Sequence, residues 1–522
     1  MSVAALARAK AHEGMEISAV AEADPTRLAI RSNQGDLNFA QLNARVNQLC
    51  HWLRGLGLNE GDSIALLCTN RQEFCEVRFA AHRTGLRLTP VNWHLTADEV
   101  AYIVSNSKAK VLFADANVNQ SATHAHQQSN ALIAQLAIGG VIEGFADYES
   151  TLAQHSSDDI SQPCLGNTML YTSGTTGRPK GVLRKQPDPN AAAAMQEILT
   201  MVFQFEPDSG KDKALVTGPL YHSGPFNLCM TTPLTAGIGI VIMEKWTPEE
   251  MLRLIQDEAI THTFCVPTMF NRLLAVDSAT KEATNLETLR FVIHGAAPTA
   301  VSTKQKMMDW FGPIIWEMFA GTEGPGTIVS PHDWLQKPGT VGKPGEGQMI
   351  ICDENGELLP KGSEGQIWVQ NPANSQFEYF NEPDKTRAAQ SIEGYFTAGD
   401  IGVIDEDGFL FITGRSAEVI IAGGVNLYPQ EIDDVLIQHP DILDCACIGA
   451  PHADLGEQVV ALIQLHEGVA QPSAQSIINF CDGKLARQKW PRIVEFKSVI
   501  PRSAAGKVLR KQLRDNYSSN QS

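Results

Sequence analysis

The chain has 522 residues, of which 43% are hydrophobic and 19% are charged. This length predicts about two to four folding units, and the composition excludes a disordered or fibrous chain. Lys and Arg number 41 and Asp and Glu number 59, so the formal net charge is 41 − 59 = −18. So acidic a chain does not fit non-specific nucleic-acid binding, which depends on neutralising phosphates. Any site for an anionic ligand must therefore be built locally.

Cysteine usage and the apolar runs bear on location. The ten cysteines form no CxxC pair and are too sparse for a disulfide scaffold. Arg8 and Lys10 are followed by no apolar stretch, so we expect no signal peptide. The longest mostly apolar run, 234–243, is shorter than the about 20 residues that span a bilayer. We expect a cytoplasmic protein without a transmembrane segment.

The first third of the chain alternates helical and strand patterns. Residues 38–53 predict a helix, with a capping box formed by Asn38 and Gln41. A strand at 63–68, a helix at 74–83 and a strand at 111–114 follow. This order favours βαβ units and a mainly parallel sheet. We interpret the polar stretch 115–162 as a variable surface region.

The middle of the chain repeats this alternation of helices and strands, and the predicted pattern of secondary structure then changes twice. Expected strands are 214–217, 238–243, 263–266 and 291–294, with a helix at 249–258. From about residue 339, crowded glycines and strands at 348–352, 365–369 and 409–413 indicate a β-rich segment. After Arg415, strands at 445–448 and 459–464 mix with helices at 429–438 and 474–481. The fold class expected is α/β, a large domain of parallel-rich sheets with helices plus a β-rich subdomain, followed by a small α+β domain.

One short loop concentrates glycine, hydroxyl and lysine side chains. Residues 171–182 read Tyr-Thr-Ser-Gly-Thr-Thr-Gly-Arg-Pro-Lys-Gly-Val. Glycines let backbone amides face an anion, hydroxyls add donors, and a lysine adds a point charge. The pattern predicts a phosphate cradle, although it is not a Walker A loop. The candidate phosphate-binding residues are Thr172, Ser173, Gly174, Thr175, Thr176, Gly177 and Lys180.

This loop resembles the signature of the adenylate-forming superfamily, which includes acyl-CoA synthetases, peptide-synthetase adenylation domains and beetle luciferases. Two further segments occur in the family's order, His-Gly-Ala-Ala-Pro at 294–298 and Phe-Ala-Gly-Thr-Glu at 319–323. The resemblance implies that the first lies along the adenine and the acyl group, with Gly295, Ala296 and Ala297 as binding residues. In the second, which includes Ala320 and Gly321, it implies that Phe319 stacks on adenine, Thr322 contacts the α-phosphate, and Glu323 holds Mg²⁺ with Thr175.

The resemblance extends to the C-terminal third. It implies that Asp400 and Arg415 bind the ribose, and that Lys507 bridges the substrate carboxylate and the α-phosphate. Gly423 and Gly424 resemble the loop that lines the coenzyme A path. The implied organisation is a large domain at 1–414, a hinge at 415–418 and a small mobile domain at 419–522. Where the family carries Asp or Lys as a pivot, this chain has Ala417.

A local excess of basic residues lies near the C-terminus. Between residues 484 and 514, ten Lys and Arg side chains are opposed in the sequence only by Glu495. One interpretation is a landing patch for the phosphates of coenzyme A. The other is a solvated helix face, and the sequence leaves both open.

The segment 219–226, Pro-Leu-Tyr-His-Ser-Gly-Pro-Phe, resembles the family's aromatic-His motif. The resemblance implies that His222 lies where acid, ATP and thiol meet, while a buried structural histidine is the alternative. The motif lacks the Asp with which amino-acid-activating domains pair the substrate amine, so an amino-acid substrate is disfavoured. Phe226, Met230, Phe270 and Met318 suggest an apolar pocket for a fatty, aromatic or ring-bearing acid.

These expectations converge on an ATP-dependent carboxylic acid:CoA ligase that uses ATP, Mg²⁺ and CoA. The alternatives are an acyl-AMP ligase that loads a carrier protein, a non-catalytic nucleotide-binding module, and a luciferase-like oxygenase. The expected partners are a small-molecule carboxylic acid, ATP and CoA, without nucleic acid and with a homodimer left open.

Overall fold

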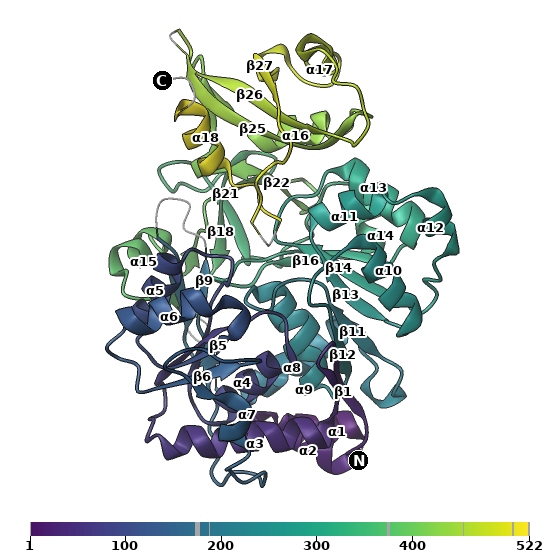
Figure 1. The fold of residues 1–522 in the computed structure, drawn as a ribbon. Coiled ribbons are helices and arrows are strands. Elements are labelled where there is room, and N and C mark those ends of the chain that lie inside the picture. Colours follow the sequence, from purple (N-terminus) through teal and green to yellow (C-terminus); the bar gives the residue numbers. More distant parts are fainter. Residues whose placement is uncertain are drawn as a thin grey trace. The chain divides into compact units, whose positions relative to one another are not determined.

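The computed structural model describes residues 2–172, 178–186, 188–372, 376–452, 454–503 and 506–519 (Figure 1). The chain forms two compact units. Unit 1 comprises residues 1–264, 278–292 and 372–388, and unit 2 comprises residues 265–277, 293–371 and 389–522. None of the helices in the described ranges is both long and apolar enough to cross a membrane.

A six-stranded sheet of parallel pairs lies in unit 1. Its order is β7 (Ala146–Asp147), β6 (Ala134–Ile138), β5 (Ala109–Asp115), β3 (Ser63–Leu67), β4 (Arg87–Pro90) and β8 (Asn167–Thr168). Side chains of α5 (Ala97–Asn106) and α6 (Asn119–Gln128) pack on one face. On the other, Phe113 of β5 meets Trp52 of α3 (Phe39–Gly55) and Tyr148 of α7 (Tyr148–Leu152). The predicted parallel sheet is confirmed.

The predicted capping box at the start of α3 is present. Gln41 donates its backbone N–H to Asn38 Oδ1 over 2.8 Å, and Asn38 donates its backbone N–H to Gln41 Oε1 over 2.9 Å. Both bonds satisfy donors that a helix start leaves open. The expected helix at 74–83 is α4 (Gln72–Arg83).

Residues 115–162 correct the interpretation of this stretch as a variable surface region, because it contains α6, β6, β7 and α7, and Leu136 and Ile138 of β6 are buried. The buried face of α6 consists of Ala122 and Ala125. Alanine buries little area, so a helix that packs through alanines carries a weak hydrophobic pattern.

An eight-stranded sheet contains the strands expected in the middle of the chain. Its order is β16 (Thr327–Val329), β15 (Ile315–Phe319), β14 (Phe291–Gly295), β13 (His262–Cys265), β11 (Lys213–Val216), β12 (Gly239–Ile242), β1 (Leu28–Ser32) and β2 (Gly35–Asn38). A three-stranded antiparallel sheet joins β19 (Phe377–Tyr379), β10 (Lys180–Arg184) and β9 (Leu170–Thr172). Further helices between residues 3 and 389 include α1 (Val3–Lys10), α2 (Glu16–Ala23), α8 (Pro189–Val202), α9 (Thr232–Thr235), α10 (Pro248–Asp257), α11 (Pro267–Leu274), α12 (Ser278–Ala283), α13 (Val301–Phe311), α14 (Pro331–Gln336) and α15 (Pro383–Ala389).

Unit 2 contains the expected β-rich segment and the expected α+β C-terminal part. The segment is an antiparallel sheet of β17 (Met349–Cys352), β18 (Glu364–Gln370), β20 (Tyr395–Phe396), β21 (Asp400–Ile404) and β22 (Leu410–Arg415). The C-terminal sheet joins β24 (Val425–Leu427), β23 (Ile420–Ala422), β26 (Gly456–Leu465), β25 (Ile442–His452) and β27 (Ile493–Phe496). With it are α16 (Pro429–Leu436), α17 (Ala474–Asn479) and α18 (Arg510–Ser519).

Candidate functional site

The predicted phosphate loop connects two antiparallel strands of unit 1. Thr172 ends β9 and is paired with Lys180, the first residue of β10. Lys180 Nζ lies 4.6 Å from the centre of the Tyr379 ring. The candidates Ser173, Gly174, Thr175, Thr176 and Gly177 lie outside the described residues, so their role stays a prediction.

The two predicted adenine segments begin at the ends of neighbouring strands, β14 and β15. Gly295 ends β14 so close to β15 that a Cβ atom there would lie 2.6 Å from the Met318 carbonyl oxygen. Only glycine permits this approach without a shift of the backbone. Phe319 ends β15 and starts the second segment. The fold thus brings residues 295–298 and 319–323 to one end of the sheet.

The backbone of the first segment is strained at one position. Ala296 adopts φ = 69°, in the left-handed region that residues other than Gly, Asn and Asp rarely enter. Its side chain is exposed, and Ala297 is half-buried. Strain of this kind persists where the surrounding structure imposes it, and it clusters at functional sites. Sequence reasoning did not find this feature, because alanine gives no sign of a left-handed turn.

The second segment packs against the residues around Asp400. A Cβ atom on Gly324, next to Glu323, would lie 2.3 Å from the Phe396 ring. Asp400 and Arg415 face each other across β21 and β22, and Arg415 Nε donates to Asp400 Oδ1 over 2.7 Å. Burial lowers the pKa of Arg415, but the Asp400, Glu418 and Glu323 carboxylates together hold it above its usual value.

Lys507, near the C-terminal end of the chain, interacts electrostatically with the same charged residues. Its loop is closed by a backbone bond of 2.8 Å from Ser503 N to Lys507 O, and residues 504 and 505 lie outside the described ranges. The side chain keeps exposed surface, yet the surrounding protein lowers its pKa by desolvation, and Arg415 lowers it further. Asp400, Glu323 and Glu418 oppose this shift. Within unit 2 the predicted residues Glu323, Asp400, Arg415 and Lys507 therefore act on one another.

The predicted hinge and coenzyme A loop are also in unit 2. Residues Ser416–Glu418 form one turn of 3₁₀ helix directly after Arg415. Gly423 and Gly424, with φ of 61° and 77°, form the two-residue turn between β23 and β24. Two left-handed residues are the requirement of a type I′ hairpin turn, so the turn itself accounts for glycine at both positions. A Cβ atom on Gly424 would meet no atom within 4 Å.

In unit 1, His222 lies in the loop after β11, next to the aromatic ring of Tyr221. The Tyr221 and His222 ring centres are 4.5 Å apart, and burial raises the pKa of Tyr221. Buried Asn70 fixes this loop: its amide nitrogen donates to the carbonyl oxygens of Gly218 (2.9 Å) and Met243 (3.1 Å). Its amide oxygen accepts from Leu220 N over 3.0 Å. Sequence reasoning missed Asn70.

The four residues predicted to line an apolar acid pocket differ in exposure. Phe226, Met230 and Phe270 are at most 2% exposed, whereas Met318 is half-buried. Phe226 and Met230 belong to unit 1, and Phe270 and Met318 belong to unit 2. Their contact with substrate stays a prediction.

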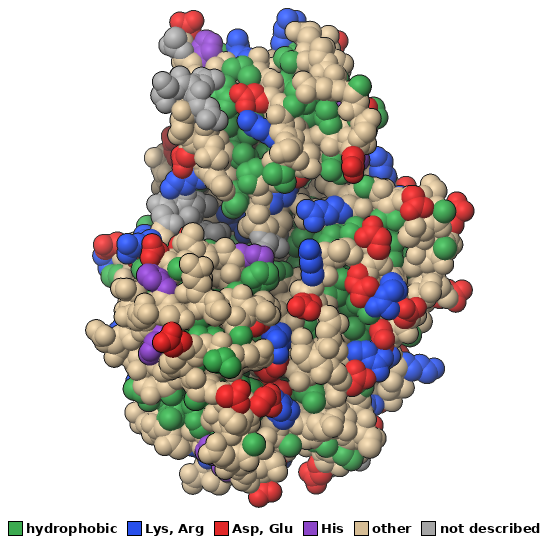
Figure 2. Space-filling model, viewed as in Figure 1, with side chains coloured by type: hydrophobic (Ala, Val, Ile, Leu, Met, Phe, Trp, Pro, Cys, Tyr) green, Lys and Arg blue, Asp and Glu red, His purple; other side chains and the backbone are tan. Residues whose placement is uncertain are grey.

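Acidic partners from elsewhere in the fold balance part of the positive charge of the basic segment 484–514. Lys489 pairs with Glu431 at 2.6 Å, Arg502 with Asp444 at 2.7 Å, and Lys497 with Glu495 at 2.8 Å, while Arg510 contacts Asp433. On the face drawn in Figure 2, basic and acidic side chains are interspersed. Within the described ranges Lys484, Arg487, Arg492, Lys507 and Lys511 form no ion pair, so any landing patch is reduced to these five.

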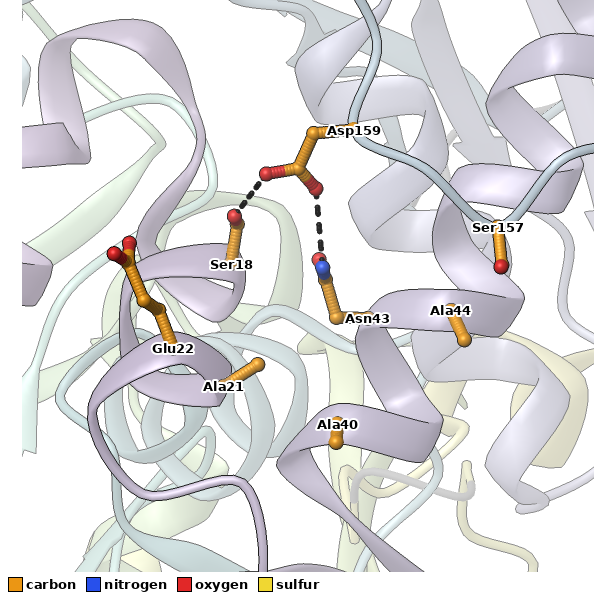
Figure 3. A pocket seen from close by; sticks show the side chains of 8 residues that line it. All are labelled: Ser18, Ala21, Glu22, Ala40, Asn43, Ala44, Ser157 and Asp159. Atoms are coloured by element: carbon orange, nitrogen blue, oxygen red, sulfur yellow. Dashed lines mark hydrogen bonds between the residues drawn. The ribbon is translucent and has the colours of Figure 1, made fainter.

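A surface pocket of about 350 Å³ lies elsewhere in unit 1 (Figure 3). Three of the side chains that line it, Ser18, Asn43 and Asp159, belong to one network. In this network Asp159 accepts hydrogen bonds from Asn43 (3.0 Å), Asn47 (2.8 Å) and Ser18. The network fastens the loop before β8 to α2 and α3, and none of the predicted site residues lines the pocket. The described residues contain no group of three His, Cys, Asp or Glu side chains that could hold a metal ion. Glu323, the predicted magnesium ligand within the described residues, offers a carboxylate oxygen of the kind that Mg²⁺ prefers.

Comparison with known proteins places the chain in a family. The AMP-binding enzyme family model matches residues 17–377, and the model of its C-terminal domain matches residues 431–507. A fatty acid–[acyl-carrier-protein] ligase, ScoC, from Streptomyces coeruleorubidus is 31% identical over 95% of each chain. A long-chain-fatty-acid–CoA ligase, FadD13, from Mycobacterium tuberculosis is 30% identical over 92% of this chain and 93% of its own.

Among solved structures, ATP-bound MatB from Rhodopseudomonas palustris superposes with a TM-score of 0.83 and 29% identity, covering 98% of this chain and 100% of its own. The chain therefore belongs to the AMP-binding enzyme family, with the adenylate-forming fold. Within that family it is an enzyme of the acyl-CoA synthetase type.

Proposed function

We propose that the protein is an ATP-dependent carboxylic acid:CoA ligase. In the first half-reaction an oxygen of the acid's carboxylate attacks the α-phosphorus of ATP, and pyrophosphate leaves. In the second, the sulfur of CoA attacks the acyl carbon, the thiol proton is released, and AMP leaves. The observation that carries the proposal is the contact of Arg415 with Asp400 over 2.7 Å in unit 2, with Glu323 and Lys507 in the same charged surroundings.

Each of these residues has a task that its chemistry suits. Two anions must approach each other in the first half-reaction, so a cation that contacts both lowers the barrier as charge develops. Lys507 is the candidate for that bridge. Asp400 would accept hydrogen bonds from the ribose hydroxyls, with Arg415 beside it. Glu323 and Thr175 would hold Mg²⁺, whose charge offsets the repulsion between carboxylate and phosphate.

Further predicted residues would bind the nucleotide. The proposed phosphate cradle is Thr172–Gly177 with Lys180, and the proposed adenine segments are 295–297 and 319–322. We also propose that the chain is organised into a domain at 1–414, a hinge at 415–418 and a domain at 419–522. Gly423 and Gly424 would then border the path of CoA, and His222 would gate or orient the reacting groups.

The proposed acid is hydrophobic: fatty, aromatic or ring-bearing. Ser223, Gly224 and Pro225 follow the aromatic-His pair, so no carboxylate there can pair with a substrate ammonium. Two relatives named above act on fatty acids according to their names. The test is an assay of CoA-dependent AMP release across straight-chain, aryl and ring-bearing acids. AMP release with amino acids alone would contradict this substrate class.

A second candidate function is the loading of a carrier protein, because one relative is named as an acyl-carrier-protein ligase. With a good acid and ATP, thioester formation is compared between CoA and a phosphopantetheinylated carrier protein. Faster turnover with the carrier protein would favour this candidate. A chain that binds ATP but exchanges no pyrophosphate with any acid would be a non-catalytic module.

Location and assembly also belong to the proposal. We propose a cytoplasmic enzyme that draws on ATP, Mg²⁺ and CoA, and a homodimer remains open to measurement by sedimentation.

A further inference from the structure

A cluster of four polar side chains lies where the two proposed adenine segments leave the sheet. His294 and Lys304 are 0% and 1% exposed, and Glu317 is 8% exposed. Lys304 Nζ lies 2.8 Å from Glu317 Oε2, and His294 Nε2 lies 3.4 Å from the same oxygen. Thr299 Oγ1 lies 3.2 Å from His294 Nδ1. We call His294, Thr299, Lys304 and Glu317 the buried quartet.

The quartet connects the places where the two segments leave the sheet. His294 directly precedes residues 295–298 and Thr299 directly follows them, so their mutual contact closes the base of this loop. Glu317 lies on β15, two residues before Phe319. Its carboxylate therefore links the base of the first loop to the strand that carries the second.

The charges within the quartet are balanced. Burial lowers the pKa of His294, and the Glu317 carboxylate opposes this shift. Burial alone would raise the pKa of Glu317, but His294 and Lys304 bring it below its usual value. Lys304 also lies 4.7 Å from the centre of the buried Trp334 ring. Lys304 and Glu317 thus form a buried ion pair beside the His294 ring.

A buried ion pair is weak support for stability, because apolar side chains of similar volume serve as well or better. Beyond packing, the quartet fixes geometry. Its contacts form only when the backbone of the first loop and the backbone of β15 are in fixed positions relative to each other. The left-handed backbone of Ala296 lies inside the loop that the His294–Thr299 contact closes. Such strain persists only where the surroundings impose it.

We propose that the buried quartet holds residues 295–298 and 319–323 in the geometry that receives the nucleotide. Its members are positioning residues, because they act through these two loops and do not themselves touch the ligand. The inference rests on the proposed function, in which the loops bind ATP.

The main test separates positioning from stability. Lys304→Met alone leaves a buried carboxylate unpaired, so this variant is expected to unfold at a lower temperature. The double variant Lys304→Met, Glu317→Leu replaces the pair with apolar side chains, and its midpoint of thermal unfolding should return to that of the wild type. Its two loops nevertheless lose their common anchor. The KM for ATP should rise about tenfold or more while the KM for CoA changes little.

A milder pair of variants tests the closure of the loop. Thr299→Val removes the hydroxyl but keeps the shape, and the KM for ATP should rise about two- to tenfold, the range expected for one hydrogen bond. Thr299→Ser keeps the hydroxyl and should restore the wild-type KM. Glu76→Gln is the control, because Glu76 lies in a separate buried network with Arg45 and Tyr148 in unit 1. It should lower stability and leave the KM for ATP unchanged.

The inference is overturned if the folded double variant and Thr299→Val both bind ATP with wild-type KM. It is overturned as well if Glu76→Gln raises the KM for ATP as much as they do. Failure of the proposed function looks different, because then the wild-type protein itself neither binds ATP, followed by calorimetry, nor exchanges pyrophosphate.

Discussion

Arg510 and Glu418 form an ion pair of 3.0 Å that ties α18, which begins shortly after Lys507, to the turn that follows Arg415. The same guanidinium contacts Asp433 and donates from Nε to the Cys447 carbonyl oxygen over 3.2 Å. A single buried arginine thus joins the proposed hinge, α16 and β25. The charge absent at Ala417 is present one residue later, in Glu418.

We predict that Glu418→Gln slows turnover without unfolding the protein. The neutral amide still fits beside Arg510, and Asp433 still balances the arginine charge, so the loss of stability should be about 1 kcal/mol. If rotation at residues 415–418 accompanies catalysis, the two half-reactions should change unequally. Pyrophosphate exchange and thioester formation are measured separately, and equal retention of both would argue against a role for this pair in the hinge.

Replacing the proposed bridging cation should abolish adenylation. For Lys507→Ala we expect pyrophosphate exchange to fall by about two to three orders of magnitude, in line with the loss of one preorganised charge. The side chain keeps exposed surface, so the midpoint of thermal unfolding should stay the same. Lys361→Ala, at an exposed lysine in a loop of unit 2, is the control and should keep full exchange. Normal exchange in Lys507→Ala would refute the assignment.

A bulky side chain at the β23–β24 turn should block the thiol step alone. Gly424→Trp is expected to abolish thioester formation and to spare pyrophosphate exchange, if CoA passes this turn. Gly468→Trp is the matched control, because Gly468 also has a positive φ and open space around its Cβ position. Equal loss of both half-reactions in Gly424→Trp would count against the CoA path.

Relieving the strained backbone should stabilise the protein and weaken the site. Ala296→Gly removes a left-handed L-residue, which should raise the free energy of unfolding by roughly 1 kcal/mol or less. Because glycine also loosens the loop, we expect a higher KM for ATP. Ala259→Gly is the control, since Ala259 has φ = 51° in unit 1. It should stabilise similarly and leave the KM for ATP unchanged.

The stability of unit 2 should depend on pH through α16. Burial raises the pKa of Asp434 from 3.8 to about 7, with Asp433 and Glu431 adding to the rise and Gln430 and Arg510 opposing it. A carboxyl with a raised pKa in the folded state binds its proton more tightly there than in the unfolded chain. Its contribution is therefore full below about pH 4 and is lost as the pH rises through about 7.

Asp434→Asn should consequently flatten the profile of unfolding temperature between pH 5 and pH 8, as followed by calorimetry. Asp433 also has a raised pKa, of about 6, but it is paired with Arg510 and is kept in this variant. A profile as steep as that of the wild type would show that Asp434 does not titrate in this range.

Most of the architecture was predictable from periodicity. The strands at 214–217 and 291–294 and the capped helix at 38–53 appear with nearly the expected bounds. The helix α6 was missed because alanines make up its buried face. Motifs indicated Asp400, Arg415, Glu323 and Lys507, whose electrostatic coupling required the fold. Asn70 was not predictable, because its hydrogen-bond partners are distant in the chain. The buried quartet was not predictable either, because its contacts form only when β14, α13 and β15 pack together.

The two glycines of the β23–β24 turn have a stereochemical consequence. Both positions take backbone angles that are natural for residues of D configuration, so mirror-image substitution there should carry no backbone penalty. A D-tryptophan installed at 424 by chemical ligation would therefore add bulk alone, whereas the L-enantiomer adds bulk and torsional strain together. The two enantiomers would distinguish an obstructed channel from a distorted hairpin at a single position.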